Sequence, residues 1–222
     1  MHRYNNIISM ILDYLVEKLT SSKIELYYDS KDGRINSAKD ENKVLNEIKN
    51  NMEIQNFFRK NEIKLIEPKI RDWFDFALSK NDLFFPINIK STNLRDNQND
   101  NLNSKLGIYY ALTGKVPDFD NEIKWESFFK KLSLNFTESK TDYFFLIINK
   151  NNTKDIFWTS LKKIETLTPT GNNLPFQCIW NKNRNHIERD YQSAKKFIMN
   201  AFEESIKKRT KILDDFNKYF KK

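Results

Sequence analysis

Apolar residues recur along this chain with two different spacings, and the wider spacing predicts helices near both ends. Over Tyr4–Leu19, Ile and Leu side chains return every three or four residues, as on a helix with one apolar face. The same spacing over Arg189–Phe220 predicts one long helix, or two. A further helix is expected from Ser37, with Ser37 as N-cap and Asp40 reaching back three residues later, and running to about Phe58.

Shorter apolar runs predict the strands and two more helices. Tyr143–Ile148 reads YFFLII and is the clearest buried strand, with further strands expected at Ile156–Thr159 and Phe176–Trp180. Helical spacing returns at Leu102–Leu112 and Glu122–Leu134. Strands and helices do not alternate strictly, so the pattern predicts an α+β fold with a central mixed β-sheet flanked by helices and a long C-terminal helix.

The stretch Arg71–Thr92 is expected to form two strands joined by a turn at Ser79–Asp82. Its first half alternates between two faces, with Phe74, Phe76 and Leu78 on one and Trp73, Asp75 and Ala77 on the other. Its second half is an apolar run that Lys90 closes. Asp75 and Lys90 are costly to bury alone, so each needs a partner, a metal ion or an exposed position.

Composition narrows the class of protein. With 222 residues, 39% of them hydrophobic, the chain favours a single ordered domain. Lys and Arg number 38 against 30 acids, a net charge of +8 that attracts polyanions such as nucleic acid, although a solvated lysine-rich surface has the same composition.

Cysteine and histidine are scarce. The single Cys178 excludes an intrachain disulfide and a cysteine-rich zinc site, and the two histidines, His2 and His186, argue against a Ser-His-Asp hydrolase or a histidine-metal nuclease. The sequence has no continuous apolar leader and no apolar run long enough to span a membrane, so we expect a soluble, cytoplasmic protein.

An Asp on one strand, followed on the next by a polar residue, any residue and Lys, is the layout of the PD-(D/E)xK nuclease core. Arg71–Thr92 resembles that superfamily, and most closely its type II restriction endonucleases. Asp75 corresponds to the first acid, and Asn88-Ile89-Lys90 to the second half, with Asn88 where Asp or Glu is usual. The run NLNSKLGIYYALTG, which ends at Gly114, is similar to a segment that follows the catalytic lysine in some small restriction enzymes.

The resemblance implies a nuclease core over about 33–150, within one domain spanning 1–222, and Mg²⁺ as cofactor. Asp75 would be the principal metal ligand, with the side-chain oxygen of Asn88, the carbonyl of Ile89 and, from an early helix, Glu41. Lys90 would orient the attacking water or stabilise the developing charge, and its pKa is expected to be lowered.

Two positions have alternatives. Asp72 is the alternative to Asp75 as the first acid of the motif. Residues three positions apart on a strand point to opposite faces, so only one of the two can be the metal ligand. Glu47 is the alternative to Glu41, and an acid in the first turn of a helix also has a structural reason to be there, because it favours the helix dipole.

The resemblance implies a sequence-specific double-stranded DNA endonuclease that cuts a short, palindromic site as a homodimer. No association with a membrane is expected. A cognate DNA methyltransferase is expected in the same system but not as a subunit. The segment 168–189 is predicted to read DNA. The apolar stripe of the N-terminal helix is expected to pack on the core or on a partner, and it is a candidate dimer interface. The predicted DNA-binding residues are Asn172, Asn173, Gln177, Lys182, Arg184 and, on a helix, Lys105.

Two other classes of function fit the same sequence. One is a non-catalytic nucleic-acid-binding protein in which Asn88 marks a degenerate nuclease site. The other is a basic structural or partner-binding protein built around its amphipathic terminal helices.

Overall fold

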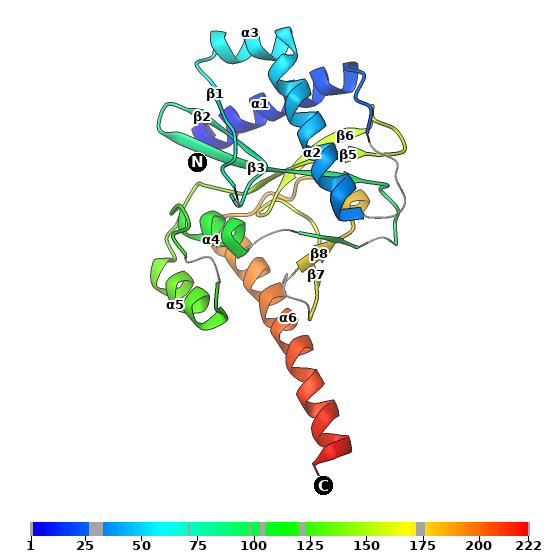
Figure 1. The fold of residues 1–222 in the computed structure, drawn as a ribbon. Helices are drawn as coiled ribbons and strands as arrows, with labels where there is room; N and C mark the ends of the chain where they lie inside the picture. Colours follow the sequence, from blue (N-terminus) through cyan, green and yellow to red (C-terminus); the bar gives the residue numbers. More distant parts are fainter. Residues whose placement is uncertain are drawn as a thin grey trace.

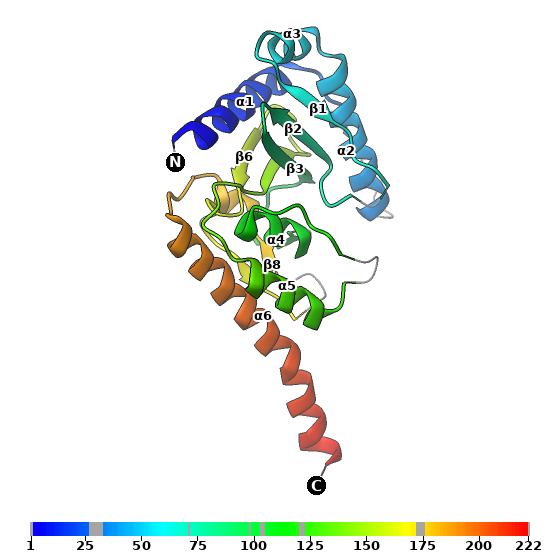
Figure 2. The same cartoon turned by 90° about the vertical axis from the view of Figure 1, so that its left-hand side faces the viewer.

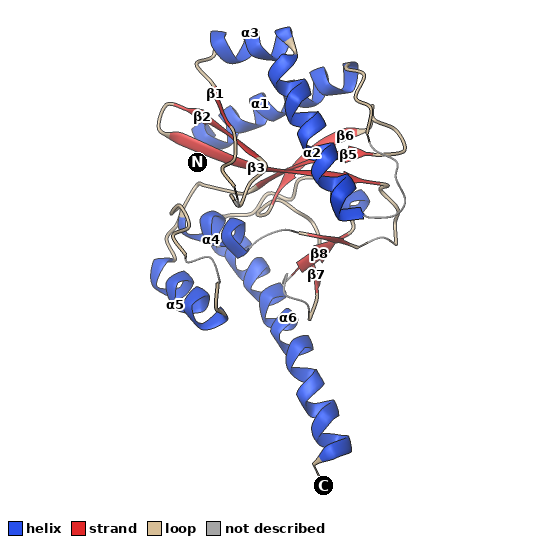
Figure 3. Cartoon of the chain, in the orientation of Figure 1, coloured by secondary structure: helices blue, strands red, loops and turns tan. Residues whose placement is uncertain are grey.

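A computed structural model describes residues 2–26, 33–70, 72–97, 99–102, 105–119, 123–171 and 176–221. The prediction of an α+β fold with a mixed sheet, flanking helices and a long C-terminal helix is confirmed (Figures 1 and 3). The main sheet has the order β1-β2-β3-β5-β6, and its strands are β1 (Lys64–Ile66), β2 (Phe76–Lys80), β3 (Leu83–Thr92), β5 (Phe144–Asn149) and β6 (Ile156–Ser160). The helices are α1 (His2–Ser21), α2 (Gly33–Asn50), α3 (Met52–Lys60), α4 (Lys105–Thr113), α5 (Trp125–Asn135) and α6 (Tyr191–Phe220).

Strand β3 joins two differently built halves of this sheet. Strands β1, β2 and β3 form an antiparallel meander, in which Phe76 of β2 lies opposite Ile87 of β3. On its other edge β3 pairs with β5 in parallel, from Ile87 beside Phe144 to Thr92 beside Asn149. A parallel pair needs a long crossover, and here the chain between the two strands carries β4, α4 and α5.

A second, small sheet lies on one side of the main sheet (Figure 3). It has the order β4-β8-β7, from β4 (Asp100–Asn101), β8 (Phe176–Cys178) and β7 (Thr168–Pro169). A 3₁₀ turn, Trp180–Asn183, follows β8 and ends the strand earlier than the predicted Trp180. The predicted recognition segment thus supplies two strands of this sheet, and the loop after β3 supplies the third.

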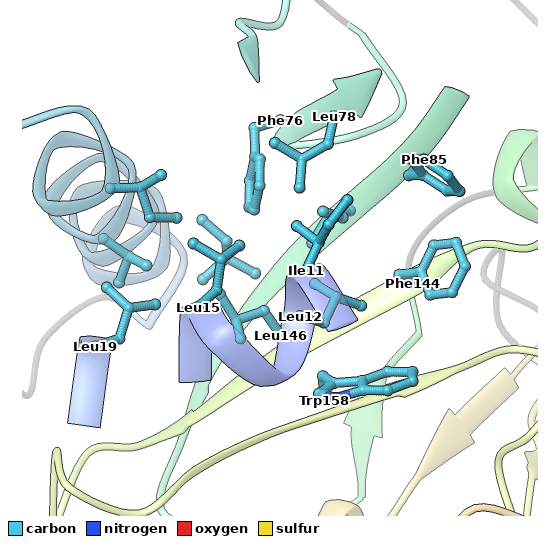
Figure 4. Packing of buried hydrophobic residues seen from close by; sticks show 14 of the residues in the cluster. Ile11, Leu12, Leu15, Leu19, Phe76, Leu78, Phe85, Phe144, Leu146 and Trp158 are labelled. Atoms are coloured by element: carbon cyan, nitrogen blue, oxygen red, sulfur yellow. The ribbon is translucent and has the colours of Figure 1, made fainter. Parts of the chain in front are cut away.

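Helices α1, α2 and α3 cover one face of the main sheet (Figure 2). The apolar stripe of α1 faces the strands, and its Ile11, Leu12 and Leu15 are fully buried against residues such as Phe85 and Leu146 (Figure 4). The stripe therefore packs on the core, which is one of its two expected places, and the sheet of the same chain covers the surface that a dimer interface would have used.

Helices α4, α5 and α6 cover the other face, where Phe145, Ile147 and Ala77 point into a second core. The buried contacts of α6 end near Ser205, and the rest of the helix extends away from the body of the molecule (Figures 1 and 2). Most of the side chains described there are exposed, with Tyr219 showing 67% of its surface.

The helix predicted from Ser37 to about Phe58 is wrong at its start and in its length. It begins at Gly33 and ends at Asn50, and a separate helix follows. Asn51 causes the break, because its side chain accepts hydrogen bonds from the N–H groups of Glu53 and Ile54 and so caps α3. Asp40 lies inside α2 and not in its first turn, where it is fully buried and pairs with Lys150 at 2.6 Å.

The hairpin differs from its prediction at the first strand. Residues 73–75 are bends, and β2 begins only at Phe76. Phe74 was expected on the face of Phe76, but it packs with Trp73 and Phe84 in the second core. The turn is also tighter than Ser79–Asp82, since Asn81, with φ 54°, lies between strands that end at Lys80 and restart at Leu83.

The remaining predicted elements lie within a few residues of their observed bounds. Helix α4 ends where Gly114 takes a φ of 69°, as the sequence TG predicted. Among the helices of the described ranges, none combines the length and apolar character that crossing a bilayer requires.

Candidate functional site

The candidate site lies where β2 stops and β3 continues alone along one edge. Opposite Ile87 the antiparallel ladder ends, and the carbonyl of Ile87 accepts a 2.9 Å hydrogen bond from the backbone N–H of Asp75. The next N–H of β3 on this edge belongs to Ile89, and it donates to Asp75 Oδ2 at 2.6 Å. The N–H and C=O of one strand residue point to the same side, so the Ile89 carbonyl also faces this edge.

Glu41 and Lys90 lie within electrostatic range of Asp75. Burial, together with the charge of Glu41, raises the pKa of Asp75 to about 7, against the opposing Ile89 hydrogen bond and Lys90 charge. Burial also raises the pKa of Glu41, opposed by Lys90 and by a hydrogen bond from Ser37. Burial lowers the pKa of Lys90, as predicted, although Asp75 and Glu41 counteract it. Three perturbed ionisable groups in one place are typical of a functional site.

Asn88 contributes an unsatisfied polar atom to the same place. Asn88 and Lys90 are two positions apart on β3, so both face the second core, whereas Ile87 and Ile89 face the first. The Asn88 side chain is 2% exposed, and its Oδ1 atom has no hydrogen-bond partner among the described residues. A buried carbonyl oxygen without a partner costs free energy, and such atoms are rare unless an ion or water completes them.

The oxygen donors at this edge fit a hard divalent cation. One carboxylate oxygen of Asp75 accepts the hydrogen bond from Ile89, which leaves the other oxygen as a possible ligand. Asn88 adds Oδ1, which has no hydrogen-bond partner among the described residues. The described part of the chain has no group of three or more His, Cys, Asp or Glu side chains placed to hold a metal. A cation here would therefore use Asp75, Glu41, Asn88 and the Ile89 carbonyl, and Mg²⁺ suits such a sparse set because it normally keeps several waters.

The rival residues lie in other surroundings. Asp72 is exposed and accepts a 2.6 Å hydrogen bond from the Lys69 N–H in a local turn. Glu47 lies further along α2 and accepts from the Asn51 side chain at 3.3 Å. The structure thus brings Asp75 and Glu41 together with Lys90, and not Asp72 or Glu47.

Of the predicted DNA-binding side chains that the structure describes, three already have partners in the chain. Gln177 donates to Asn101 at 3.0 Å. Arg184 binds Asp155 through both terminal nitrogens at 2.8 Å. Lys105 lies 4.0 Å from the Trp125 ring centroid and donates to a backbone carbonyl. Lys182 is exposed on the 3₁₀ turn, and Asn172 and Asn173 lie outside the described residues.

Three further residues shape the site and were not predicted. Tyr143 is buried beside Asn88 and Asp75. Asp100 approaches Lys90 from β4 and accepts a 2.6 Å hydrogen bond from Thr92. Asp40, one residue before Glu41, accepts from Ser91 at 3.0 Å. Only Asp40 had a signal in the sequence, its place next to Glu41, since the other two depend on contacts between distant segments.

No family model matches the chain, and no curated protein matches it significantly.

Proposed function

We propose that this chain is a Mg²⁺-dependent endonuclease of the type II restriction class, which hydrolyses phosphodiester bonds in double-stranded DNA. The observation that carries the proposal is the meeting of Asp75, Glu41 and Lys90 beside the orphaned oxygen of Asn88, where β2 ends. This supports the resemblance of Arg71–Thr92 to the PD-(D/E)xK core, because the spacing of the motif and the contacts of its residues point to one place.

The chemistry follows from the charges. When bound, Mg²⁺ would supply charge neutralisation at the scissile phosphate and a lower pKa for a bound water. Asp75 and Glu41 repel one another when both are ionised, so they favour a cation between them. Lys90, whose pKa burial lowers, would orient a water or stabilise the charge that develops on the phosphorane oxygens.

The DNA partner is proposed from charge and from exposure. The net charge of +8 favours a polyanion as partner, and the exposed Lys182 is available to contact its phosphates. Gln177 and Arg184 would first have to release Asn101 and Asp155. A palindromic target would call for a homodimer with two-fold symmetry, because a symmetric site is matched by a symmetric protein.

The decisive experiment is cleavage of unmethylated plasmid and phage DNA with MgCl₂, with an excess of EDTA as the blank. Discrete fragments are expected with Mg²⁺ only. Asp75→Ala and Lys90→Ala should each lower the cleavage rate by about 100-fold or more, the scale of losing one charge-stabilising group. Asp72→Ala and Lys64→Ala remove the same charges from exposed positions and should cleave like the wild type.

Two results would contradict the proposal in different ways. Near wild-type cleavage by Asp75→Ala or Lys90→Ala would remove that residue from the site. Salt-sensitive DNA binding by the wild type without Mg²⁺-dependent cleavage would support a non-catalytic nucleic-acid-binding protein instead.

A further inference from the structure

Tyr143 is a buried phenol that contacts the candidate site without carrying charge into it. It immediately precedes β5 and lies on the sheet face of Phe145, whose neighbour on β3 is Asn88. It is 1% exposed, and its hydroxyl donates a 2.7 Å hydrogen bond to the carbonyl of Trp73, two residues before Asp75. Burial and the nearby Asp75 charge raise the pKa of Tyr143, and the neighbouring Asn88 side chain opposes them.

The hydrogen bond to Trp73 decides which end of Asn88 suits the phenol. The single hydroxyl proton of Tyr143 goes to the Trp73 carbonyl, so toward the neighbouring Asn88 side chain the phenol oxygen is left only as an acceptor. A carboxamide accepts through its oxygen and donates through its nitrogen, and its two ends have nearly the same shape. The phenol therefore selects the NH₂ end, which leaves Oδ1 as the buried oxygen without a partner.

We propose that Tyr143 is a positioning residue that fixes the Asn88 carboxamide with its oxygen toward the cation held by Asp75 and Glu41. This inference rests on the proposed Mg²⁺ site. It also explains why an amide serves where an acid is usual in the resembled nucleases. A carboxylate presents oxygen at both ends, whereas an amide is a dependable ligand only if a neighbour fixes its orientation.

The test measures Mg²⁺ binding by the rise of melting temperature with MgCl₂, starting from EDTA-treated protein. Tyr143→Phe keeps the ring and removes the acceptor, and should weaken the apparent Mg²⁺ affinity by about three- to tenfold, the scale of one hydrogen bond. Tyr109→Phe is the matched control. Its hydroxyl also accepts from an asparagine, Asn135 at 3.0 Å, and its removal should leave the Mg²⁺ affinity unchanged.

A second background shows whether the phenol acts through Asn88. In Asn88→Asp, adding Tyr143→Phe should change the Mg²⁺ affinity by less than about twofold, because a carboxylate needs no orientation. Should Asn88→Asp fail to fold, Asn88→Ala serves in its place, and Tyr143→Phe should again add nothing.

Three results would overturn the inference. One is that Tyr143→Phe lowers the melting temperature in EDTA but keeps the wild-type Mg²⁺ affinity, which is a purely structural effect. Another is that its effect on Mg²⁺ affinity persists in full in both Asn88 backgrounds. If folded wild-type protein shows no Mg²⁺-dependent shift, the proposed metal site fails as well, so the two failures are distinguishable.

Discussion

Asp75 is a carboxyl group that the fold holds near half-ionisation at neutral pH. Its pKa of about 7 results first from burial and then from the charge of Glu41. An acid whose pKa is higher in the folded than in the unfolded chain binds its proton more tightly when folded. The stability it contributes is fully present below the unfolded pKa, near 4, and is lost as the pH rises to about 7.

This predicts a measurable pH dependence in the absence of divalent cations. From pH 4 to pH 7, Asp75 should lower the free energy of unfolding by at most about 1.4 kcal/mol per pH unit. Asp75→Asn should remove this part of the slope, and Asp72→Asn should keep it. Urea unfolding in EDTA at a series of pH values gives the comparison, and identical slopes for wild type and Asp75→Asn would show that the Asp75 pKa is not raised.

Two glycines predict opposite responses to the same substitution. A Cβ atom at Gly107 would lie 2.5 Å from Cδ1 of the Tyr143 ring, whereas one at Gly171 would meet nothing closer than 3.4 Å. Gly107→Ala should therefore destabilise the protein by about 1–3 kcal/mol through overpacking, despite the better helix propensity of alanine. Gly171→Ala should change stability by less than about 0.5 kcal/mol. Equal melting temperatures for the two variants would contradict this.

At the level of the site residues, the sequence predicted those that lie on the β2–β3 hairpin and on α2. Asp75, Asn88 and Lys90 lie within a single motif, so their proximity followed from the motif alone. Tyr143 hydrogen-bonds a carbonyl 70 positions away, and no local pattern marks such a contact. Asp40 was assigned to a cap because its spacing from Ser37 fits one, but burial against Lys150 determined its place instead.

At the scale of elements, local polar chemistry set the boundaries that hydrophobic spacing left open. The apolar positions continue through α2 and α3 without interruption, so they predicted one helix. Asn51 divides it, and in a chain rich in asparagine a capping asparagine does not stand out from its neighbours. Phe74 was placed on the wrong face for a similar reason, since alternation holds only once the chain enters β2.

The cap at Asn51 makes a quantitative prediction. Asn51→Ala should destabilise the protein by about 1 kcal/mol, because two N–H groups at the start of α3 lose their acceptor. Asn50→Ala changes the exposed residue next to it and should be within about 0.5 kcal/mol of wild type. Thermal unfolding of both variants tests the assignment, and a harmless Asn51→Ala would show that the helix break has another cause.

At the scale of the whole molecule, α6 belongs to the fold for only part of its length. Ile198, Ala201 and Phe202 are buried in the second core, and Ser205 donates to the Thr170 carbonyl. Next along α6, Lys208 and Arg209 contact the loop of the small sheet by donating hydrogen bonds to the carbonyls of residues 169 and 171.

A shortened chain tests this division. Protein ending at Thr210 should unfold within a few degrees of the full chain, because it keeps every one of those contacts. Protein ending at Lys196 loses the buried Ile198, Ala201 and Phe202 and should not fold cooperatively. A large loss of stability on ending at Thr210 would mean that the projecting part of α6 is held by something other than this chain's own core.

The parallel pairing of β3 with β5 has a consequence for how the chain is made. The meander from β1 to β3 joins neighbouring segments and can form early, whereas β5 must close a loop that contains β4, α4 and α5. Until it does, the long edge of β3 is a row of open backbone groups, ready to pair with another nascent chain. The strand that holds Asn88 and Lys90 is therefore the segment most exposed to aggregation during synthesis, and slower growth at low temperature should raise the soluble yield.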